Sequence, residues 1–300
     1  MSEKKGIKPV NPETFFPNRF AGKVLLITGA AFGSIGGCTA IRAAREGAKV
    51  MCVDIKKTEL EQTVSEIIKN GGEATALVAD IRKPELADKA VHETVKLYGK
   101  LDLVLNAAGV MDGNDPSKPQ DFENTLNLLP SSIHNATDEY WHNVMDANIN
   151  GMFYCMRAQL KQMISQDVGG AIVNIGSIAG IIGLPGNSAY SASKHAVTGI
   201  TRNAAIDYAP YGIRVNSVNM AQTDTPMVFR AYEFVKWAME KGMGSGMAGL
   251  KSQSLLSASE PSGRGSTPWE QAAFILFLLS EDASNITGAT YATDGGWTTY

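Results

Sequence analysis

Residues 23–36 read KVLLITGAAFGSIG, a short apolar run that leads into a glycine-rich turn and then into a helical pattern. Glycines between a strand and a helix let the backbone approach a pyrophosphate, and the first N–H groups of the helix favour negative charge. The sequence therefore predicts a dinucleotide-binding turn, although such turns also occur without a ligand. The contacts expected in it are Gly29, Gly33, Ser34, Ile35 and Gly36.

Similar apolar runs recur along the chain and alternate with helical segments. They are KVLLIT (23–28), AKVMCVD (48–54), EATALVAD (73–80), LDLVLNA (101–107), AIVNIGS (171–177), IRVNSVN (213–219) and ATYAT (289–293). Runs without polar alternation are typical of parallel strands that helices cover on both faces. The pattern predicts a single α/β domain, a doubly wound parallel seven-stranded Rossmann-type sheet with helices on both faces.

We place an N-terminal extension at residues 1–22, an ordered surface strap, and the domain at residues 23–300. Asp112–Asn135 is polar and broken by prolines, which indicates a long excursion from the fourth strand, before a helix that opens at Thr137. Whether it shapes a pocket wall or an oligomer surface stays open.

A second interruption, Pro226–Pro268, joins a Met- and aromatic-rich helical piece to the glycine patch KGMGSGMAG. We interpret residues 226–262 as a substrate lid rather than as plain core or an oligomer contact, because a long loop in a compact domain is usually functional. Trp237 and Phe234 are expected to contact an apolar substrate.

Composition excludes several classes of protein. Hydrophobic residues make up 44% of the 300 residues and the net charge is −3, so we expect a globular protein with no nucleic-acid or membrane partner. No apolar leader or long apolar run suggests export or membrane insertion. Cys38, Cys52 and Cys155 are expected to be buried, reduced thiols in a cytoplasmic protein, without disulfide or metal.

Asp54 ends the second apolar run, 18 residues after Gly36, near the spacing at which a carboxylate would grip the adenosine ribose hydroxyls. A carboxylate there repels a 2′-phosphate. The sequence therefore favours NAD(H) over NADP(H) as the cofactor, and Lys56 and Lys57 are better explained as a solvated helix start.

Tyr190 and Lys194 are spaced i, i+4, so they share one face of a helix and can address one reacting centre. A phenol is a weak acid, and a neighbouring ammonium is expected to lower its pKa toward the working range. Ser177, just after the fifth run, would hydrogen-bond the reacting oxygen. Each signal is weak alone, but together they predict a proton-transfer site.

With these motifs the chain resembles the short-chain dehydrogenase/reductase family from Phe20 to Trp297. The matching pieces are the glycine turn, Asp80-Ile81, Asn106-Ala107-Ala108-Gly109, Asn148, Ser177, Tyr190-Ser191-Ala192-Ser193-Lys194 and Asp294-Gly295-Gly296. The resemblance implies a catalytic tetrad of Asn148, Ser177, Tyr190 and Lys194.

The resemblance also implies further cofactor contacts. Asp80 and Ile81 would flank the adenine, Asn106 would brace the sheet beneath the cofactor, and Thr225 would meet the carboxamide. Ala107, Gly109, Tyr190 and Lys194 complete the expected set. Asn148 would anchor a water that relays protons.

Two departures from the family pattern stand out. The glycine turn carries one extra residue, so that either Gly33 keeps the role of the second glycine or Ser34 replaces it. After the sixth strand, Met220-Ala221 stands where the family commonly has Pro-Gly, which leaves the path of the local loop in doubt.

The leading hypothesis is an NAD-dependent alcohol dehydrogenase or ketone reductase for a bulky, apolar secondary alcohol, such as a hydroxysteroid. The alternatives are a 3-oxoacyl thioester reductase and a non-catalytic dinucleotide-binding sensor. The resemblance further implies a homotetramer in which the helices of Asn148 and Tyr190 pair across symmetry axes. Met152, Cys155 and Ala196 are expected on their outward faces.

Overall fold

A computed structural model describes residues 7–242 and 264–299 and contains a fully parallel seven-stranded sheet of order β3-β2-β1-β4-β5-β6-β7. The strands are β1 (Val24–Thr28), β2 (Lys49–Asp54), β3 (Glu73–Val78), β4 (Leu103–Asn106), β5 (Gly170–Ile175), β6 (Ile213–Met220) and β7 (Thr290–Thr293). The strand order reverses between β1 and β4, and ligands of such sheets bind at this point, beyond the carboxyl ends of the strands. The predicted fold class is confirmed.

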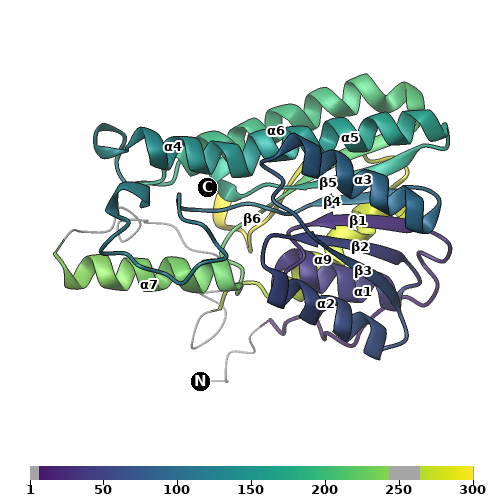
Figure 1. Ribbon diagram of the computed structural model, residues 1–300, viewed down its shortest axis with the longest axis horizontal. Coiled ribbons are helices and arrows are strands. Elements are labelled where there is room, and N and C mark those ends of the chain that lie inside the picture. Colours follow the sequence, from purple (N-terminus) through teal and green to yellow (C-terminus); the bar gives the residue numbers. More distant parts are fainter. Residues whose placement is uncertain (1–6, 243–263, 300) are drawn as a thin grey trace.

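Helices cover both faces of the sheet (Figure 1). One face carries α1 (Ile35–Arg45), α2 (Lys57–Lys69) and α9 (Pro268–Leu279), and the other carries α3 (Pro84–Tyr98), α5 (Gly151–Gln166) and α6 (Ser188–Tyr208). Each face buries its own apolar cluster. Ile41, Leu60 and Ile275 belong to the first cluster, and Met156 and Val197 belong to the second.

Short turns complete the described chain. They are η1 (Leu126–Leu128), η2 (Ile133–Asn135), η3 (Asp146–Asn150), η4 (Ile178–Gly180), η5 (Ala209–Tyr211), η7 (Glu281–Ala283) and η8 (Trp297–Thr299). Helix α4 (Asp138–Met145) begins where expected, because the Thr137 side chain accepts a hydrogen bond from the N–H of Tyr140 at 3.1 Å. Helix α7 (Pro226–Glu240) is the predicted amphipathic piece.

Residues 7–22 form a strap that is anchored on a buried carboxylate. Glu46 is fully buried, and it accepts hydrogen bonds from the Nε atoms of Arg19 at 2.6 Å and Arg42 at 3.0 Å. At the start of the strap, the Ile7 carbonyl accepts from Arg264 at 3.1 Å. The strap thus joins the outer end of α1 to the chain segment just before α9.

The excursion after β4 packs on one stripe of α7. Phe122 lies 5.6 Å from Phe234 and 5.4 Å from Trp237 between ring centroids, and Lys241 pairs with Glu123 at 2.6 Å. The excursion therefore contributes to the same wall as α7. The expectation that Phe234 and Trp237 contact substrate is wrong, because both rings face Phe122 and neither lines the cavity.

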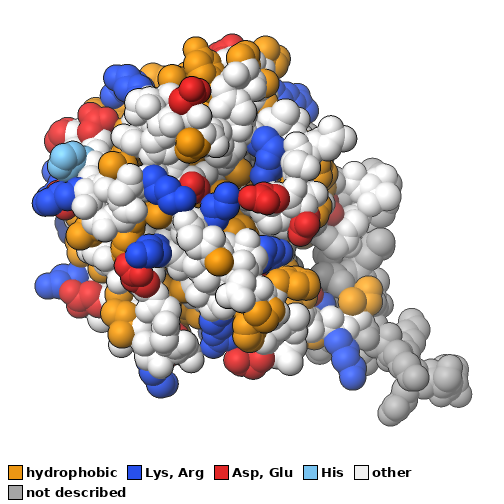
Figure 2. Space-filling model, turned by 90° about the vertical axis from the view of Figure 1, so that its right-hand side faces the viewer, with side chains coloured by type: hydrophobic (Ala, Val, Ile, Leu, Met, Phe, Trp, Pro, Cys, Tyr) orange, Lys and Arg blue, Asp and Glu red, His pale blue; other side chains and the backbone are white. Residues whose placement is uncertain are grey.

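The helical half of the interpreted lid is α7, whereas most of the glycine patch and the rest of the interval to residue 262 lie outside the described residues. Among the helices that the structure describes, each is too short or too polar to cross a bilayer. The face shown in Figure 2 has basic and acidic side chains interspersed, in keeping with the small net charge.

Two residues that were expected on the outward faces of the tetramer helices, Met152 and Cys155, are buried instead. Both residues are only 2% exposed, because their side chains point from α5 into the domain rather than outward. Cys38 and Cys52 are also buried, as predicted, and burial raises the pKa of all three thiols to about 12.

Candidate active site

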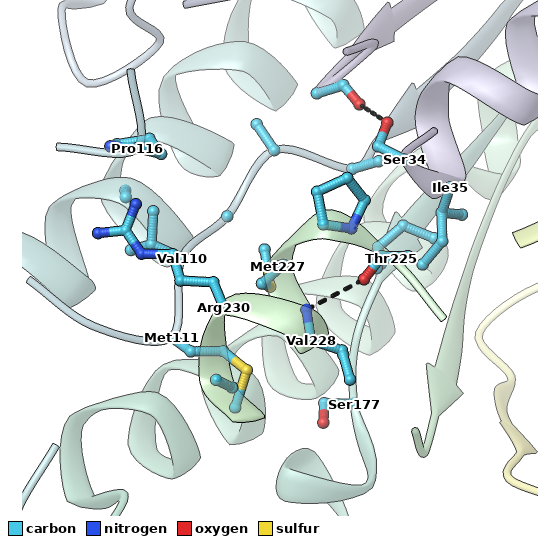
Figure 3. A pocket seen from close by; sticks show the side chains of 18 of the residues that line it. Ser34, Ile35, Val110, Met111, Pro116, Ser177, Thr225, Met227, Val228 and Arg230 are labelled. Carbon is cyan, nitrogen blue, oxygen red and sulfur yellow. Dashed lines mark hydrogen bonds between the residues drawn. The ribbon is translucent and has the colours of Figure 1, made fainter. Parts of the chain in front are cut away.

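One cavity of about 960 Å³ opens at the carboxyl ends of the strands, at the point where the strand order reverses. It runs from Asp54 and Asp80 at one end to Ser177, Tyr190 and Lys194 at the other. The glycine turn, the segment after β4 and the start of α7 line it between these ends, as Figure 3 shows in part. Residues far apart in the sequence therefore share one space.

The glycine turn accommodates its extra residue at the N-cap position of α1. Ser34 is the N-cap residue: its hydroxyl donates to the Gly29 carbonyl and accepts from the Gly37 N–H, both at 3.0 Å. Ser34 lines the cavity, whereas Gly33 does not and instead adopts a φ of +75°. Ser34 therefore stands at the cavity wall, and Gly33 supplies the backbone turn.

Asp54 is held by backbone N–H groups at the end of β2. Its carboxylate accepts from Ala31 at 2.9 Å and from Lys56 at 2.9 Å. Burial raises the pKa of this carboxyl and outweighs these hydrogen bonds, which act in the opposite direction. The bond to Ala31 ties the carboxylate to the glycine turn and fixes the distance between them.

Asp80 and Ile81 follow β3 and line the same end of the cavity. Arg82 grips the Asp80 carboxylate through its Nε at 2.9 Å and its Nη2 at 2.7 Å. Burial favours a higher pKa for Asp80, but the hydrogen bonds and charge of Arg82 outweigh it and hold the pKa below its usual value. The Asp80 carboxylate is therefore ionised and rigidly placed.

The segment after β4 forms the floor of the cavity. Ala107 and Gly109 line it. Asn106 does not line it, but exchanges hydrogen bonds with Gln159 at 2.9 and 3.1 Å and donates to Asn174 at 3.0 Å. These bonds join β4 to α5 and β5, as the predicted sheet brace would.

Tyr190 and Lys194 lie on the inner face of α6, and both are nearly fully buried. The Lys194 Nζ lies 5.7 Å from the centroid of the Tyr190 ring and donates to the Ile175 carbonyl at 2.9 Å. Ser177 lies at the cavity wall beside them, and its Oγ accepts from the Ala179 N–H at 3.1 Å.

The expected lowering of the Tyr190 pKa is not what this geometry gives. Burial raises the pKa of Tyr190 and outweighs the hydrogen bond to Ser177, which acts the other way. Burial also lowers the pKa of Lys194 to about 8. Both shifts have one cause, since the apolar surroundings disfavour the charged form of each group.

Asn148 lies in η3, a π-helical turn that joins α4 to α5. Its side chain forms three hydrogen bonds: Oδ1 accepts from the Val110 N–H at 2.7 Å, and Nδ2 donates to the Val110 carbonyl and to Ser193 Oγ. It does not line the cavity. The relay water expected at Asn148 stays a prediction.

Thr225 begins α7 beside the cavity. Its hydroxyl accepts from the Val228 N–H at 3.3 Å, the bond drawn in Figure 3. Met220 and Ala221, which replace the family's usual Pro-Gly, also line the cavity. The altered loop therefore still delivers Thr225 to the cavity wall.

Comparison with known proteins was decisive for the family. Residues 29–298 match the family model described as enoyl-(acyl carrier protein) reductase. A 3beta-hydroxysteroid dehydrogenase of Mediterraneibacter gnavus is 38% identical, over 95% of this chain and 98% of the relative. The chain belongs to the short-chain dehydrogenase/reductase family. It is therefore an oxidoreductase.

Other short-chain dehydrogenases/reductases agree in length and fold. A cyclohexanol dehydrogenase of an Acinetobacter species is 36% identical, over 95% of this chain and 99% of the relative. A solved short-chain dehydrogenase from Mycobacterium paratuberculosis bound to NAD is 28% identical with a TM-score of 0.78, over 94% of this chain and 100% of that chain.

In this short-chain dehydrogenase/reductase, the cavity brings most of the predicted site residues together. They are Gly29, Ser34, Ile35, Gly36, Asp54, Asp80, Ile81, Ala107, Gly109, Ser177, Tyr190, Lys194 and Thr225. Gly33, Asn106 and Asn148 lie behind the wall. His195, the residue after Lys194, is exposed, and its ring Nδ1 lies 2.9 Å from the Ser191 carbonyl oxygen.

Five charged residues of the cavity wall were not predicted from the sequence: Glu59, Arg82, Asp112, Arg230 and Arg264. Part of the signal was present, because Arg230, Phe234, Trp237 and Lys241 are spaced as one helical stripe. Periodicity shows which residues share a face, but it does not show what that face meets.

Proposed function

We propose that this short-chain dehydrogenase/reductase uses NAD(H) to interconvert a bulky, apolar secondary alcohol, such as a hydroxysteroid, and its ketone. The observation that carries the proposal is the single cavity that joins the Asp54 carboxylate to the Ser177, Tyr190 and Lys194 side chains. One end suits the adenosine of a dinucleotide, and the other suits proton transfer at its nicotinamide.

The residues present fit a nicotinamide dinucleotide. The start of α1 offers N–H groups to a pyrophosphate, and a carboxylate ends β2 beside it. Asp54 would hold the ribose hydroxyls, Ile81 would cover the adenine, and Thr225 would meet the carboxamide. Relatives of known structure that bind NAD, including the one from Mycobacterium paratuberculosis, support this choice.

The nicotinamide supplies hydride exchange when it is bound. Tyr190 accepts the alcohol proton during oxidation and returns it during reduction. Ser177 holds the same oxygen and stabilises the charge that develops on it. Burial raises the pKa of Tyr190, and the hydrogen bond to Ser177 acts in the opposite direction. The Lys194 ammonium, 5.7 Å from the centre of the Tyr190 ring, adds a positive charge that attracts the phenolate.

The walls of the cavity support the substrate class. Apolar side chains from three segments line it: Val110, Met111, Ile178, Leu184, Met227, Val228 and Val235. An apolar wall of this extent gains free energy by enclosing a large hydrocarbon skeleton. The similarity to a 3beta-hydroxysteroid dehydrogenase and to a cyclohexanol dehydrogenase points the same way.

The chemistry is tested by a panel of steroids, sugar alcohols and acyl thioesters with Tyr190→Phe as the variant. We expect turnover of an alcohol or ketone to fall about 100-fold or more while NADH binding changes little, because only the proton-transferring hydroxyl is lost. Tyr208→Phe, the same change at the far end of α6, is the matched control. Turnover that survives in Tyr190→Phe would refute the assignment.

Cofactor choice is tested by titrating NADH and NADPH with fluorescence detection. The wild type should bind NADH more tightly than NADPH. Asp54→Ala should reduce this difference in affinity, because it removes the carboxylate that repels the 2′-phosphate of NADPH. Equal affinity of the wild type for both cofactors would contradict the assignment.

A second candidate is reduction of a 3-oxoacyl thioester. The description of the matching family model also names an enzyme of acyl thioesters, but one that reduces a carbon–carbon double bond rather than a ketone. Such reductases usually use NADPH, and the Asp54 carboxylate would repel the 2′-phosphate of that cofactor. The substrate panel separates the two, since thioesters are among its members. A panel with no Tyr190-dependent turnover would instead favour a dinucleotide sensor.

A further inference from the structure

The cavity has one charged corner that the proposed reaction does not use. Arg230 reaches from α7 to the segment that holds Val110 and Pro116, and in Figure 3 it lies across the pocket from Ser177. Its Nε is 3.4 Å from Asp112 Oδ2, and the two side chains are 19% and 17% exposed. The corner is therefore a half-sheltered ion pair on an otherwise apolar wall.

The Arg230 guanidinium is satisfied on one side only. Its Nε donates to the side-chain amide oxygen of Gln120 at 3.1 Å, in the amide orientation in which the Gln120 side-chain nitrogen also donates to Glu233. Among residues 7–242 and 264–299, neither terminal nitrogen of Arg230 has a hydrogen-bond acceptor. These two nitrogens carry most of the donors of a guanidinium, so the corner presents N–H groups in need of oxygen.

The other two arginines of the cavity wall differ on this point. Arg82 holds Asp80 through Nε and Nη2, and Arg264 holds Glu270 through both terminal nitrogens at 2.8 and 3.0 Å. In both pairs, two nitrogens of the guanidinium bind a carboxylate of the protein itself, which is the geometry of a bidentate structural ion pair. Arg230 instead faces its carboxylate partner, Asp112, with Nε rather than with its two terminal nitrogens.

We propose that Arg230 binds an oxygen acceptor, a carboxylate or a carbonyl, that the substrate carries at the end remote from its reacting hydroxyl. This rests on the proposed function and narrows it to apolar secondary alcohols with a second, oxygen-bearing end. Arg230 is thus a specificity-determining residue. Asp112 holds the Arg230 side chain in place and reduces its net attraction for an anion.

The test uses three versions of one bulky secondary alcohol, which end in a carboxylate, a methyl ester or a methyl group. The wild type should prefer the first two. Arg230→Gln should lower kcat/KM for the carboxylate by about tenfold to 100-fold, mainly through KM, since a hydrogen bond to a charged group is lost. The methyl-terminated alcohol should be nearly unaffected.

Asp112→Asn should act in the opposite direction to Arg230→Gln, because it removes a competing negative charge while keeping an acceptor for the Asn114 N–H that bonds Asp112. It should raise the preference for the carboxylate over the methyl-terminated alcohol. Lys241→Gln is the control, since it breaks an ion pair between α7 and the excursion without altering the cavity wall.

Three outcomes would overturn the proposal: a wild type without preference for an oxygen-bearing end, an equal loss for all three alcohols in Arg230→Gln, or a shift of both cavity variants in the same direction. The last two would make the ion pair a structural tie only. Should Arg230→Gln fail to bind NADH, Asp112→Asn decides alone. If the wild type turns over none of the alcohols, the proposed function fails, whereas turnover without preference refutes only this inference.

Discussion

Lys194 illustrates how burial alone changes a side chain at this site. Lys194 is 4% exposed, and burial lowers the pKa of its ammonium from 10.5 to about 8. The folded protein therefore binds this proton less tightly than the unfolded chain does. Between about pH 8 and 10.5 the unfolded chain holds more protons at this position, so this residue's contribution to stability rises with pH.

We expect the stability difference between wild type and Lys194→Met to depend on pH, since groups remote from Lys194, such as the buried thiols, cancel in that difference. Relative to the variant, the wild type should gain stability as pH rises from 7 toward 10. Thermal unfolding at a series of pH values checks this. A difference that does not change with pH would mean that Lys194 is not held in apolar surroundings.

Gly33 and Gly36 predict contrasting outcomes for the same change to alanine. A Cβ at Gly36 would lie 2.2 Å from the Gly29 carbonyl oxygen, whereas at Gly33 the nearest atom is a Pro226 carbon at 3.7 Å. Gly33→Ala should cost about 1–2 kcal/mol through its positive φ, and NADH should still bind. Gly36→Ala should unfold at a much lower temperature and lose NADH binding. Similar behaviour of the two variants would contradict this account of the turn.

Much of the site was predictable from single residues, because strand ends and helix starts are local signals. Asp54, Ser177 and Tyr190 each lie next to such a boundary, and their meeting follows from parallel strands ending at one edge. The role of Ser34 was not predictable, since its hydroxyl bonds depend on the path of the turn. The Tyr190 pKa was also missed, because sequence shows a nearby lysine but not the depth of burial.

Helix α7 and the excursion after β4 pack against each other and form one wall of the cavity. Phe122 contacts Phe234 and Trp237, so the α7 stripe that sequence periodicity suggested for substrate is occupied by the excursion. The elements themselves were predicted correctly. Their partnership was not, because a proline-rich segment without periodicity gives no sign of the face on which it packs.

Phe122→Ala should loosen this wall. We expect a several-fold rise in KM for a bulky apolar substrate, with little change in NADH affinity, because the lost ring contacts are each worth about 0.5–1.5 kcal/mol. Phe229→Ala, on an exposed α7 side chain, is the control. Hydrogen exchange should increase along residues 226–240 in Phe122→Ala only. Unchanged exchange would show that α7 holds its place independently.

The whole molecule is predicted to be a homotetramer, from family resemblance, with α5 and α6 at the contacts. The buried Met152 and Cys155 leave Phe153, which is 45% exposed beneath Arg157, as an apolar group available on α5. Light scattering should show a tetramer, and Phe153→Glu should reduce the mass. Val168→Glu, an exposed position in the turn after α5, should not. A wild-type monomer at micromolar concentration would refute the prediction.

The strap has a consequence for anyone who shortens this protein. A chain begun at Lys23, just before the first strand, would lose Arg19 and leave the buried Glu46 carboxylate with Arg42 as its cationic partner among the described residues. Losing a hydrogen bond to a buried charge costs about 1.5–3 kcal/mol, a large share of a typical domain's stability. A trimmed version should therefore begin no later than Phe16, whose N–H also bonds Glu46, or replace Glu46 by an uncharged side chain.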